Sequence, residues 1–244
     1  MTELTYEQPL NEKTRSYLRL EYLADQLEFN FENDHQHACF FPLFSLWELC
    51  ERCDYRNDVI KEFDRQLCLL NKWRDLPDSD KPQIQQLVDK INLHRCQLIK
   101  SPRLGQALKN DRFLSAIRQR FSMPGASCSF DLPQLHFWLG KPWSERQHNY
   151  QVWCEHFRPL LEAVKLILEL CRNTAQFQTK TAASGFYQGE SNQALSLVRV
   201  RLKECNGCYP TVSGNRNRFA IHFVTFEHHK HTDQAIEFEL AACR

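Results

Sequence analysis

The spacing of apolar residues changes once along this chain of 244 residues, near Phe177. Before that point apolar residues recur every three or four positions, as they do along one face of an α-helix. After it they alternate with polar residues, which is typical of β-strands buried on one face. We therefore predict an α+β protein. An all-helical N-terminal domain, residues 1–176, should precede a small antiparallel, sandwich-like β domain, residues 177–244.

Helix signals are frequent in the N-terminal part of the chain. We expect the first four helices over residues 11–28, from about Pro42, over 55–73 and over 82–99. Asn11 provides an N-cap for the first of them, and Pro82 suits the first turn of the fourth. A longer helical pattern runs from Ser144 to about Ala175. Pro159 should kink or split this helix, because proline has no amide hydrogen to donate.

Residues 103–139 form the most distinctive segment of the helical part. The segment should begin with one basic amphipathic helix. This helix should end at Pro124, because proline cannot continue it. A short helix capped by Asp131 should follow and carry His136 and Trp138. This arrangement fits one wall of an anion-binding cleft. A surface-charged core helix followed by a packing helix accounts for the same pattern, because basic faces are often only solvated faces.

Three segments define the expected β part. Residues 196–204 and 235–240 alternate between apolar and polar, and residues 218–226 are apolar on both faces, as in a central strand. Turn signals such as Ser213-Gly214 separate them. The alternation predicts one buried set of side chains: Val198, Val200, Leu202, Ile236, Phe238 and Leu240.

The overall charge argues against bulk electrostatic binding to nucleic acid, because the formal net charge is only +1. No apolar run approaches the roughly 20 residues that cross a bilayer, and the first residues lack a signal-peptide pattern. We therefore expect a cytosolic protein.

The 11 cysteines should act as small buried apolar residues, since a reducing cytosol disfavours disulfides. Two CxxC pairs, Cys50/Cys53 and Cys205/Cys208, raise the possibility of zinc. Their separation exceeds the usual spacing of a zinc site, so we expect no metal and no cofactor. The histidines of residues 228–231 lie in a polar turn, where we expect a solvated loop without a partner ligand.

Motifs of catalysis do not occur in the sequence: there is no phosphate-binding glycine loop, no GxSxG and no HExxH. Arginines recur instead at the edges of the expected elements. Arginine stays charged and can hold a carboxylate through two hydrogen bonds, which favours binding of an acidic peptide over catalysis. Two alternatives remain at this point, a nucleic-acid-binding module and a hydrolase with a cysteine–histidine pair.

Several stretches of the chain together resemble the ZapD family of bacterial cell-division proteins. The resemblance rests on stretches in the same order as in the family: PLNEKTRSYLRLEYL, SPRLGQALKNDRFLSAIRQR, CSFDLPQLHFWL, GFYQ, RFAI and the terminal FEL. It implies a homodimer that binds the C-terminal tail of the tubulin-like GTPase FtsZ through a basic pocket. It further implies cross-linking of FtsZ filaments and stabilisation of the Z ring at midcell. Charge, apolar runs and missing motifs add the expectation that the protein is not an enzyme and has neither nucleic acid nor membrane as a partner.

The resemblance also implies particular tail-binding residues. Those at matching motif positions are Arg19, Arg52, His136 and Arg218. Charge and motif position add Arg56, Arg103, Arg112, Arg118 and Arg216. We expect Phe137 and Trp138 to form an aromatic wall beside them. His222 stands where the family pattern has arginine, a difference that would weaken the pocket or make it sensitive to pH.

Overall fold

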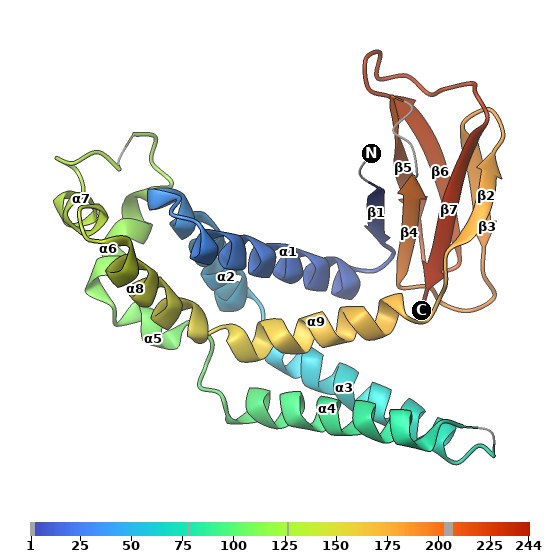
Figure 1. Ribbon diagram of the computed structural model, residues 1–244, viewed down its shortest axis with the longest axis horizontal. Helices are drawn as coiled ribbons and strands as arrows, with labels where there is room; N and C mark the ends of the chain where they lie inside the picture. Colours follow the sequence, from blue (N-terminus) through green and yellow to red (C-terminus); the bar gives the residue numbers. More distant parts are fainter. Residues whose placement is uncertain (1–2, 78, 126, 203–206) are drawn as a thin grey trace. The chain divides into compact units, whose positions relative to one another are not determined.

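The architecture is described from a computed structural model that covers residues 3–77, 79–125, 127–202 and 207–244 (Figure 1). The helices are α1 (Glu12–Glu32), η1, a 3-10 helix (Gln36–Cys39), α2 (Phe40–Arg52), α3 (Tyr55–Arg74), α4 (Lys81–Lys100), α5 (Gln106–Lys109), α6 (Arg112–Phe121), α7 (Pro133–Leu139), α8 (Trp143–Glu155) and α9 (Arg158–Arg172). The strands are β1 (Leu4–Pro9), β2 (Gln178–Ala182), β3 (Phe186–Glu190), β4 (Leu197–Leu202), β5 (Cys208–Gly214), β6 (Arg218–Thr225) and β7 (Ile236–Cys243). The predicted α+β class is confirmed.

The chain forms two compact units. One contains the residues up to Arg19 together with Ile167–Arg244, and the other contains Leu20–Leu166. Helices α1 and α9 each contribute residues to both units. The expected domain boundary at residue 176 stays a prediction.

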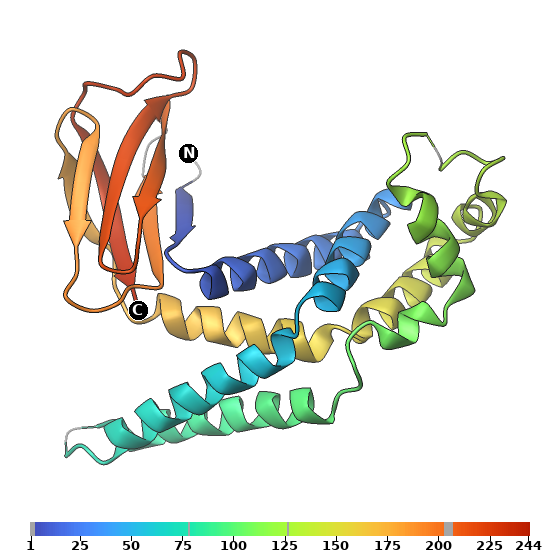
Figure 2. The same ribbon diagram turned by 180° about the vertical axis from the view of Figure 1, so that it is seen from behind.

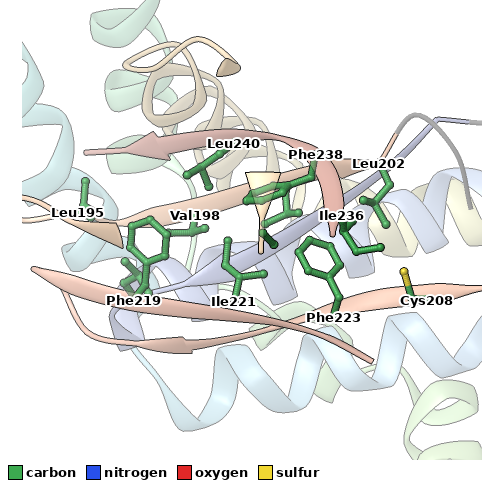
Figure 3. Packing of buried hydrophobic residues seen from close by; sticks show 13 residues of the cluster. Leu195, Val198, Leu202, Cys208, Phe219, Ile221, Phe223, Ile236, Phe238 and Leu240 are labelled. Carbon is green, nitrogen blue, oxygen red and sulfur yellow. The ribbon is translucent and has the colours of Figure 1, made fainter. Parts of the chain in front are cut away.

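Two antiparallel sheets make up the strand-containing unit, with strand orders β1-β4-β7-β2 and β3-β6-β5. Their facing sides share one apolar core, in which the rings of Phe223 in β6 and Phe238 in β7 have centroids 5.2 Å apart (Figure 3). The predicted alternation is confirmed, because the six side chains expected to be buried in β4 and β7 all lie in this core. The predicted central strand is β6, which lies between β3 and β5.

Strand β1 was not anticipated from the sequence. It pairs with β4 along its whole length, from Leu4 opposite Leu202 to Pro9 opposite Leu197. Its edge position suits Pro9, which has no amide hydrogen for a further neighbour. The strand is mostly polar, and its partner lies nearly 200 residues away in sequence, so hydrophobic periodicity gave no signal for it.

Glu7 of β1 binds two arginines of the same unit. Its carboxylate accepts hydrogen bonds from Arg172 Nη2 at 2.6 Å and from Arg199 Nε at 2.8 Å. Burial alone would raise the pKa of Glu7, but these hydrogen bonds and charges outweigh burial and hold the pKa below its ordinary value. The three side chains are 18–22% exposed, so the cluster is largely removed from water.

The helical unit is built around Phe40, which is fully buried at the start of α2. Its ring contacts five other aromatic rings, those of Phe44, Phe113, Phe121, Trp138 and Trp153. These rings come from α2, α6, α7 and α8, so one aromatic cluster joins four helices. Helices α3 and α4 run antiparallel as a hairpin in the same unit (Figure 2). Within the part of the chain that the structure describes, no helix has the length and apolarity needed to span a membrane.

The helix boundaries confirm two sequence signals. Asn11 Oδ1 accepts a hydrogen bond from Thr14 N at 2.8 Å and so caps α1, which continues to Glu32 and not only to Glu28. The expected split before Pro159 is also present, because α8 ends at Glu155 and α9 begins at Arg158.

Two expectations for residues 103–139 are wrong. The basic segment forms two helices instead of one, because Gly105 adopts a left-handed conformation and Asp111 caps a new helix by accepting a hydrogen bond from Leu114 N at 3.0 Å. Asp131 does not cap α7. Its carboxylate instead pairs with Arg120 at 3.1 Å, and the residue that precedes α7 is Leu132.

We expect Glu7→Ala to lower the free energy of unfolding by about 3 kcal/mol, the lower end of the cost of breaking a buried ion pair, because two arginines lose their partner. The pKa of Glu7 is lower in the folded than in the unfolded chain, so its contribution is present above its ordinary pKa of 4.5 and is lost as the pH falls below that value. Urea unfolding of parent and variant at neutral and acidic pH measures this difference.

A matched control is Glu237→Ala, which removes an exposed carboxylate from β7 of the same sheet. Glu237 has no ion pair within the described part of the chain, so its removal should change stability by less than about 0.5 kcal/mol. Equal destabilisation by the two variants would contradict a special role for Glu7.

Candidate functional site

A hollow of about 560 Å³ lies beside the end of α2 and the start of α3. It brings together three of the arginines predicted from the sequence, Arg52, Arg56 and Arg103. The other residues that line it are Cys50, Glu51, Cys53, Asp54, Tyr55, Asn57 and Leu104. This hollow is the best-supported candidate site in the helical unit.

Local capping places two of the arginines at the hollow. Helix α2 ends at Arg52, because Cys53 adopts an extended conformation that cannot continue the helix. Asp54 then caps α3 by accepting a hydrogen bond from Asn57 N at 3.5 Å, so that Arg56 lies in the first turn of α3. The short connection between the two helices therefore holds both guanidinium groups at one edge.

Gly105 allows the backbone next to Arg103, the third arginine, to pass close to Trp47. A Cβ atom at this residue would lie 2.8 Å from Cδ1 of the buried Trp47, a distance that side chains do not tolerate, and the φ angle of +69° favours glycine as well. Only glycine lets the backbone pass this close to Trp47. Arg103 and Leu104, which immediately precede it, thereby line the hollow.

The three arginines differ in how fully they are occupied. Arg56 donates to Ser101 Oγ at 3.3 Å and to the carbonyl of Pro102, so it holds the chain between α4 and α5 in place. Among the described residues Arg52 pairs with Glu48 alone, one turn earlier, and the Arg52 side chain is 72% exposed. Arg103 is exposed, and its guanidinium has no partner among the described residues. Arg52 and Arg103 are thus available to a ligand, whereas Arg56 is structural.

Glu51 joins the hollow to two further cations. Its carboxylate accepts a hydrogen bond from Arg118 Nη2 at 2.7 Å and pairs with Lys109 Nζ at 2.9 Å. The hydrogen bond from Arg118, followed by that from Lys109, lowers the pKa of Glu51 to about 2. The guanidinium of Arg118 also lies 4.2 Å from the ring centre of Trp47, a cation–π contact.

The charges around the hollow do not cancel. Its lining holds three arginines and two carboxylates, those of Glu51 and Asp54, and the ion pairs of the lining residues add Glu48, Lys109 and Arg118. This leaves an excess of two positive charges, and the two available arginines lie at the surface. The sequence analysis did not identify the carboxylates that pair with these cations. The i, i+4 spacing of Glu48 and Arg52 is a local signal for the first of these ion pairs.

The remaining predicted residues lie outside this hollow. Arg112, at the start of α6, and His136, in α7, are exposed in the helical unit. In the other unit Arg19 and Arg216 are exposed, and Arg218 pairs with Glu190 at 2.6 Å. The convergence of all nine residues on one cleft stays a prediction.

The expected aromatic wall is wrong for Trp138. This side chain is only 5% exposed, belongs to the Phe40 cluster, and donates from Nε1 to Asn149 Oδ1 at 3.1 Å. Its neighbour Phe137 is 73% exposed and is the only one of the two that a ligand can reach. The helical period explains the difference, because adjacent residues point about 100° apart around a helix.

The cysteines at the hollow do not form a metal site on the described residues. No group of three or more histidine, cysteine or acidic side chains placed to hold an ion occurs in that part of the chain. Cys205, a member of the second CxxC pair, lies outside the described residues. Burial raises the pKa of the Cys50 thiol to about 12, so this thiol stays protonated at neutral pH. The expectation of a protein without a structural metal stays a prediction.

Comparison with known proteins identifies the family of the chain. A family model described as "ZapD: Cell division protein" matches residues 18–222. A protein of Shewanella sp. (strain MR-4) named "Cell division protein ZapD" is 61% identical over 243 residues, and one of the same name from Vibrio vulnificus (strain CMCP6) is 40% identical over 246 residues. Both alignments cover 100% of each chain.

We expect Glu51→Gln to destabilise the protein by about 1 kcal/mol at neutral pH, because two charge-assisted hydrogen bonds weaken at a site whose side chain is 27% exposed. The folded-state pKa is lowered from 4.5 to about 2, so the stabilisation is complete above pH 4.5 and is lost as the pH falls through about 2. Parent and variant should therefore approach each other in melting temperature as the pH is lowered across this window.

Glu48→Gln is the matched control for that measurement. Glu48 lies in the same helix, but its side chain is 49% exposed and, within the described part of the chain, pairs with Arg52 alone, so we expect a change below about 0.5 kcal/mol at every pH. A pH-independent loss for Glu51→Gln would show that its ion pairs are not the cause.

Proposed function

The chain belongs to the ZapD family of cell-division proteins, and from this premise we propose that it binds the C-terminal tail of the tubulin-like GTPase FtsZ. We further propose that it acts as a homodimer that cross-links FtsZ filaments and stabilises the Z ring. In this proposal the protein works in the cytoplasm at midcell as a binding protein and not as an enzyme. Neither nucleic acid nor membrane is a partner.

The observation that supports tail binding best is the hollow with its two available arginines. Arg52 and Arg103 are exposed at the rim, and the surrounding charges leave a positive excess. A guanidinium group forms two parallel hydrogen bonds with a carboxylate, so an acidic peptide is the ligand that this rim suits best. Leu104, which is half-buried in the same lining, offers apolar surface to the peptide's apolar side chains.

The other predicted residues have two different roles in this proposal. Arg56 and Arg118 maintain the shape of the hollow through their contacts with Pro102 and Glu51. Further contacts of the tail would come from the exposed members of the predicted set: Arg19, Arg112, His136, Arg216 and Arg218.

Bridging follows from valency and needs no catalysis. A tail that is disordered before binding loses entropy when it is ordered, so one site should bind with modest affinity. A dimer presents two such sites to filaments that display many tails, and the second binding event then occurs at a high effective concentration. The proposed dimer therefore links filaments with an avidity that one site does not provide.

We expect Arg52→Ala and Arg103→Ala each to weaken binding of a peptide with the FtsZ tail sequence by up to about fivefold, which corresponds to about 1 kcal/mol for an ion pair at an exposed side chain. Arg52→Glu should weaken it further and abolish bundling of filaments. Fluorescence anisotropy measures binding, and added salt should reduce the affinity of the parent because part of the attraction is screened.

Lys72→Glu is the matched control, with circular dichroism to verify folding. Lys72 is exposed on α3, about 24 Å along the helix from Arg56, and so lies far from the hollow. Lys72→Glu changes the net charge of the protein by the same amount as Arg52→Glu. If folded Arg52→Glu and Arg103→Glu variants bind the tail as tightly as Lys72→Glu, the hollow is not the tail site.

The proposed homodimer gives a separate expectation for mass. Light scattering at micromolar concentration should give about twice the chain mass of 29.0 kDa. Sedimentation with FtsZ filaments should show bundles that are lost when the FtsZ tail is deleted. A protein that stays monomeric at every concentration and still bundles filaments would contradict bridging by a dimer.

A further inference from the structure

Two histidines, one in β6 and one in the connection that follows it, lie side by side on the outer face of the three-stranded sheet. The rings of His222, in β6, and His231, in the connection from β6 to β7, have centroids 4.7 Å apart and planes inclined by 51°. Ile221 and Phe223 point into the core, so His222 between them points to the opposite face. His231 is exposed, as expected for a solvated turn, but its ring has a neighbour that the sequence did not indicate.

Backbone contacts fix the position of His231. It forms an isolated antiparallel bridge with Val224, and the amide of the next residue, Thr232, donates to the carbonyl of Phe223 at 3.0 Å. Thr232 lies so close to Gly185 that a Cβ atom on residue 185 would be 2.2 Å from the carbonyl oxygen of Thr232. Because only glycine permits this approach, the segment that carries His231 is held against the sheet and is not a free loop.

We propose that His222 and His231 chelate a divalent first-row transition-metal ion of the kind that prefers imidazole ligands, namely Cu²⁺, Ni²⁺ or Zn²⁺. Metal–imidazole bonds are about 2.0–2.1 Å long, which puts each ring centre about 3.2 Å from the ion. Two such rings are then about 4.5 Å apart for ligands at a right angle and about 5.2 Å apart for tetrahedral ligands. The observed 4.7 Å lies within this range.

The surroundings of the pair suit a reversible site. The ring of Phe186, in β3, lies 4.7 Å from that of His222 and limits its orientation. His231 is exposed, so an ion and its water molecules can reach the pair. The described residues place no third histidine, cysteine or acidic side chain in the cluster, so water fills the remaining coordination positions. Such a site exchanges its ion readily and differs from the structural zinc that the cysteine pairs suggested.

The test is isothermal titration of the untagged full-length protein with Ni²⁺, chosen because Cu²⁺ would oxidise a chain with 11 cysteines. We expect one Ni²⁺ per chain. His231→Gln and His222→Phe should each weaken binding more than about tenfold, since even an outer-shell partner of a metal ligand contributes about 10- to 100-fold. The phenylalanine keeps an aromatic ring against Phe186, so it separates loss of a ligand from loss of stacking.

The double variant His228→Gln/His229→Gln is the matched control. Both residues lie in the same connection but outside the ring pair, and their removal should leave the Ni²⁺ affinity unchanged. Urea unfolding verifies that every variant is folded. If the parent binds no Ni²⁺, or if folded His222→Phe and His231→Gln bind it as the parent does, the two rings form a stacking contact only and the proposal fails.

Discussion

The burial of Phe40 is the interaction on which the helical unit and its candidate site depend. Its ring is inaccessible to water and contacts aromatic rings of α2, α6, α7 and α8. Removing a buried phenylalanine side chain costs about 3–5 kcal/mol, so this cluster supplies a large share of the net stability of a typical domain. The same helices carry the charged residues of the site. Because the cluster fixes α2 against α6, Glu51 of one helix faces Arg118 of the other at hydrogen-bond distance.

Each unit uses one carboxylate to hold two cations. Glu7 binds Arg172 and Arg199 in the strand-containing unit, and Glu51 binds Arg118 and Lys109 in the helical unit. In both cases the pKa of the carboxyl group is held below its ordinary value. The cations in these clusters are therefore structural. A count of arginines in the sequence consequently overstates the positive charge that a ligand meets, and the free charge is concentrated on exposed side chains such as Arg52 and Arg103.

Several elements with local signals were predicted from the sequence, although the break at Gly105 and Asp111 was missed, and strand β1, which depends on a distant contact, was missed as well. The Asn11 cap, the break before Pro159 and the alternation in β4 and β7 follow from neighbouring residues, and all are present. Strand β1 is polar and finds its partner far along the chain, so no local pattern indicated it. At the site, charge and motif position selected three arginines that share one hollow. The same signals do not show which cations are already paired, since the partner Glu51 lies 67 residues from Arg118 in sequence.

The geometry of the hollow also bears on how strongly a single site should bind in the proposed function. Its arginines are at the surface, where ion pairs contribute up to about 1 kcal/mol each and are weakened by salt. A deep, desolvated arginine would bind an acidic tail more tightly, but it would also need a carboxylate of the protein to stabilise it when the tail is absent, as Arg118 needs Glu51. Arg103 has no such competitor among the described residues, and Arg52 meets only the exposed carboxylate of Glu48, so both release their ligand quickly. Weak, rapidly exchanging contacts of this kind join filaments only when several act together, so the strength of a cross-link would be set by the number of sites and not by the affinity of one.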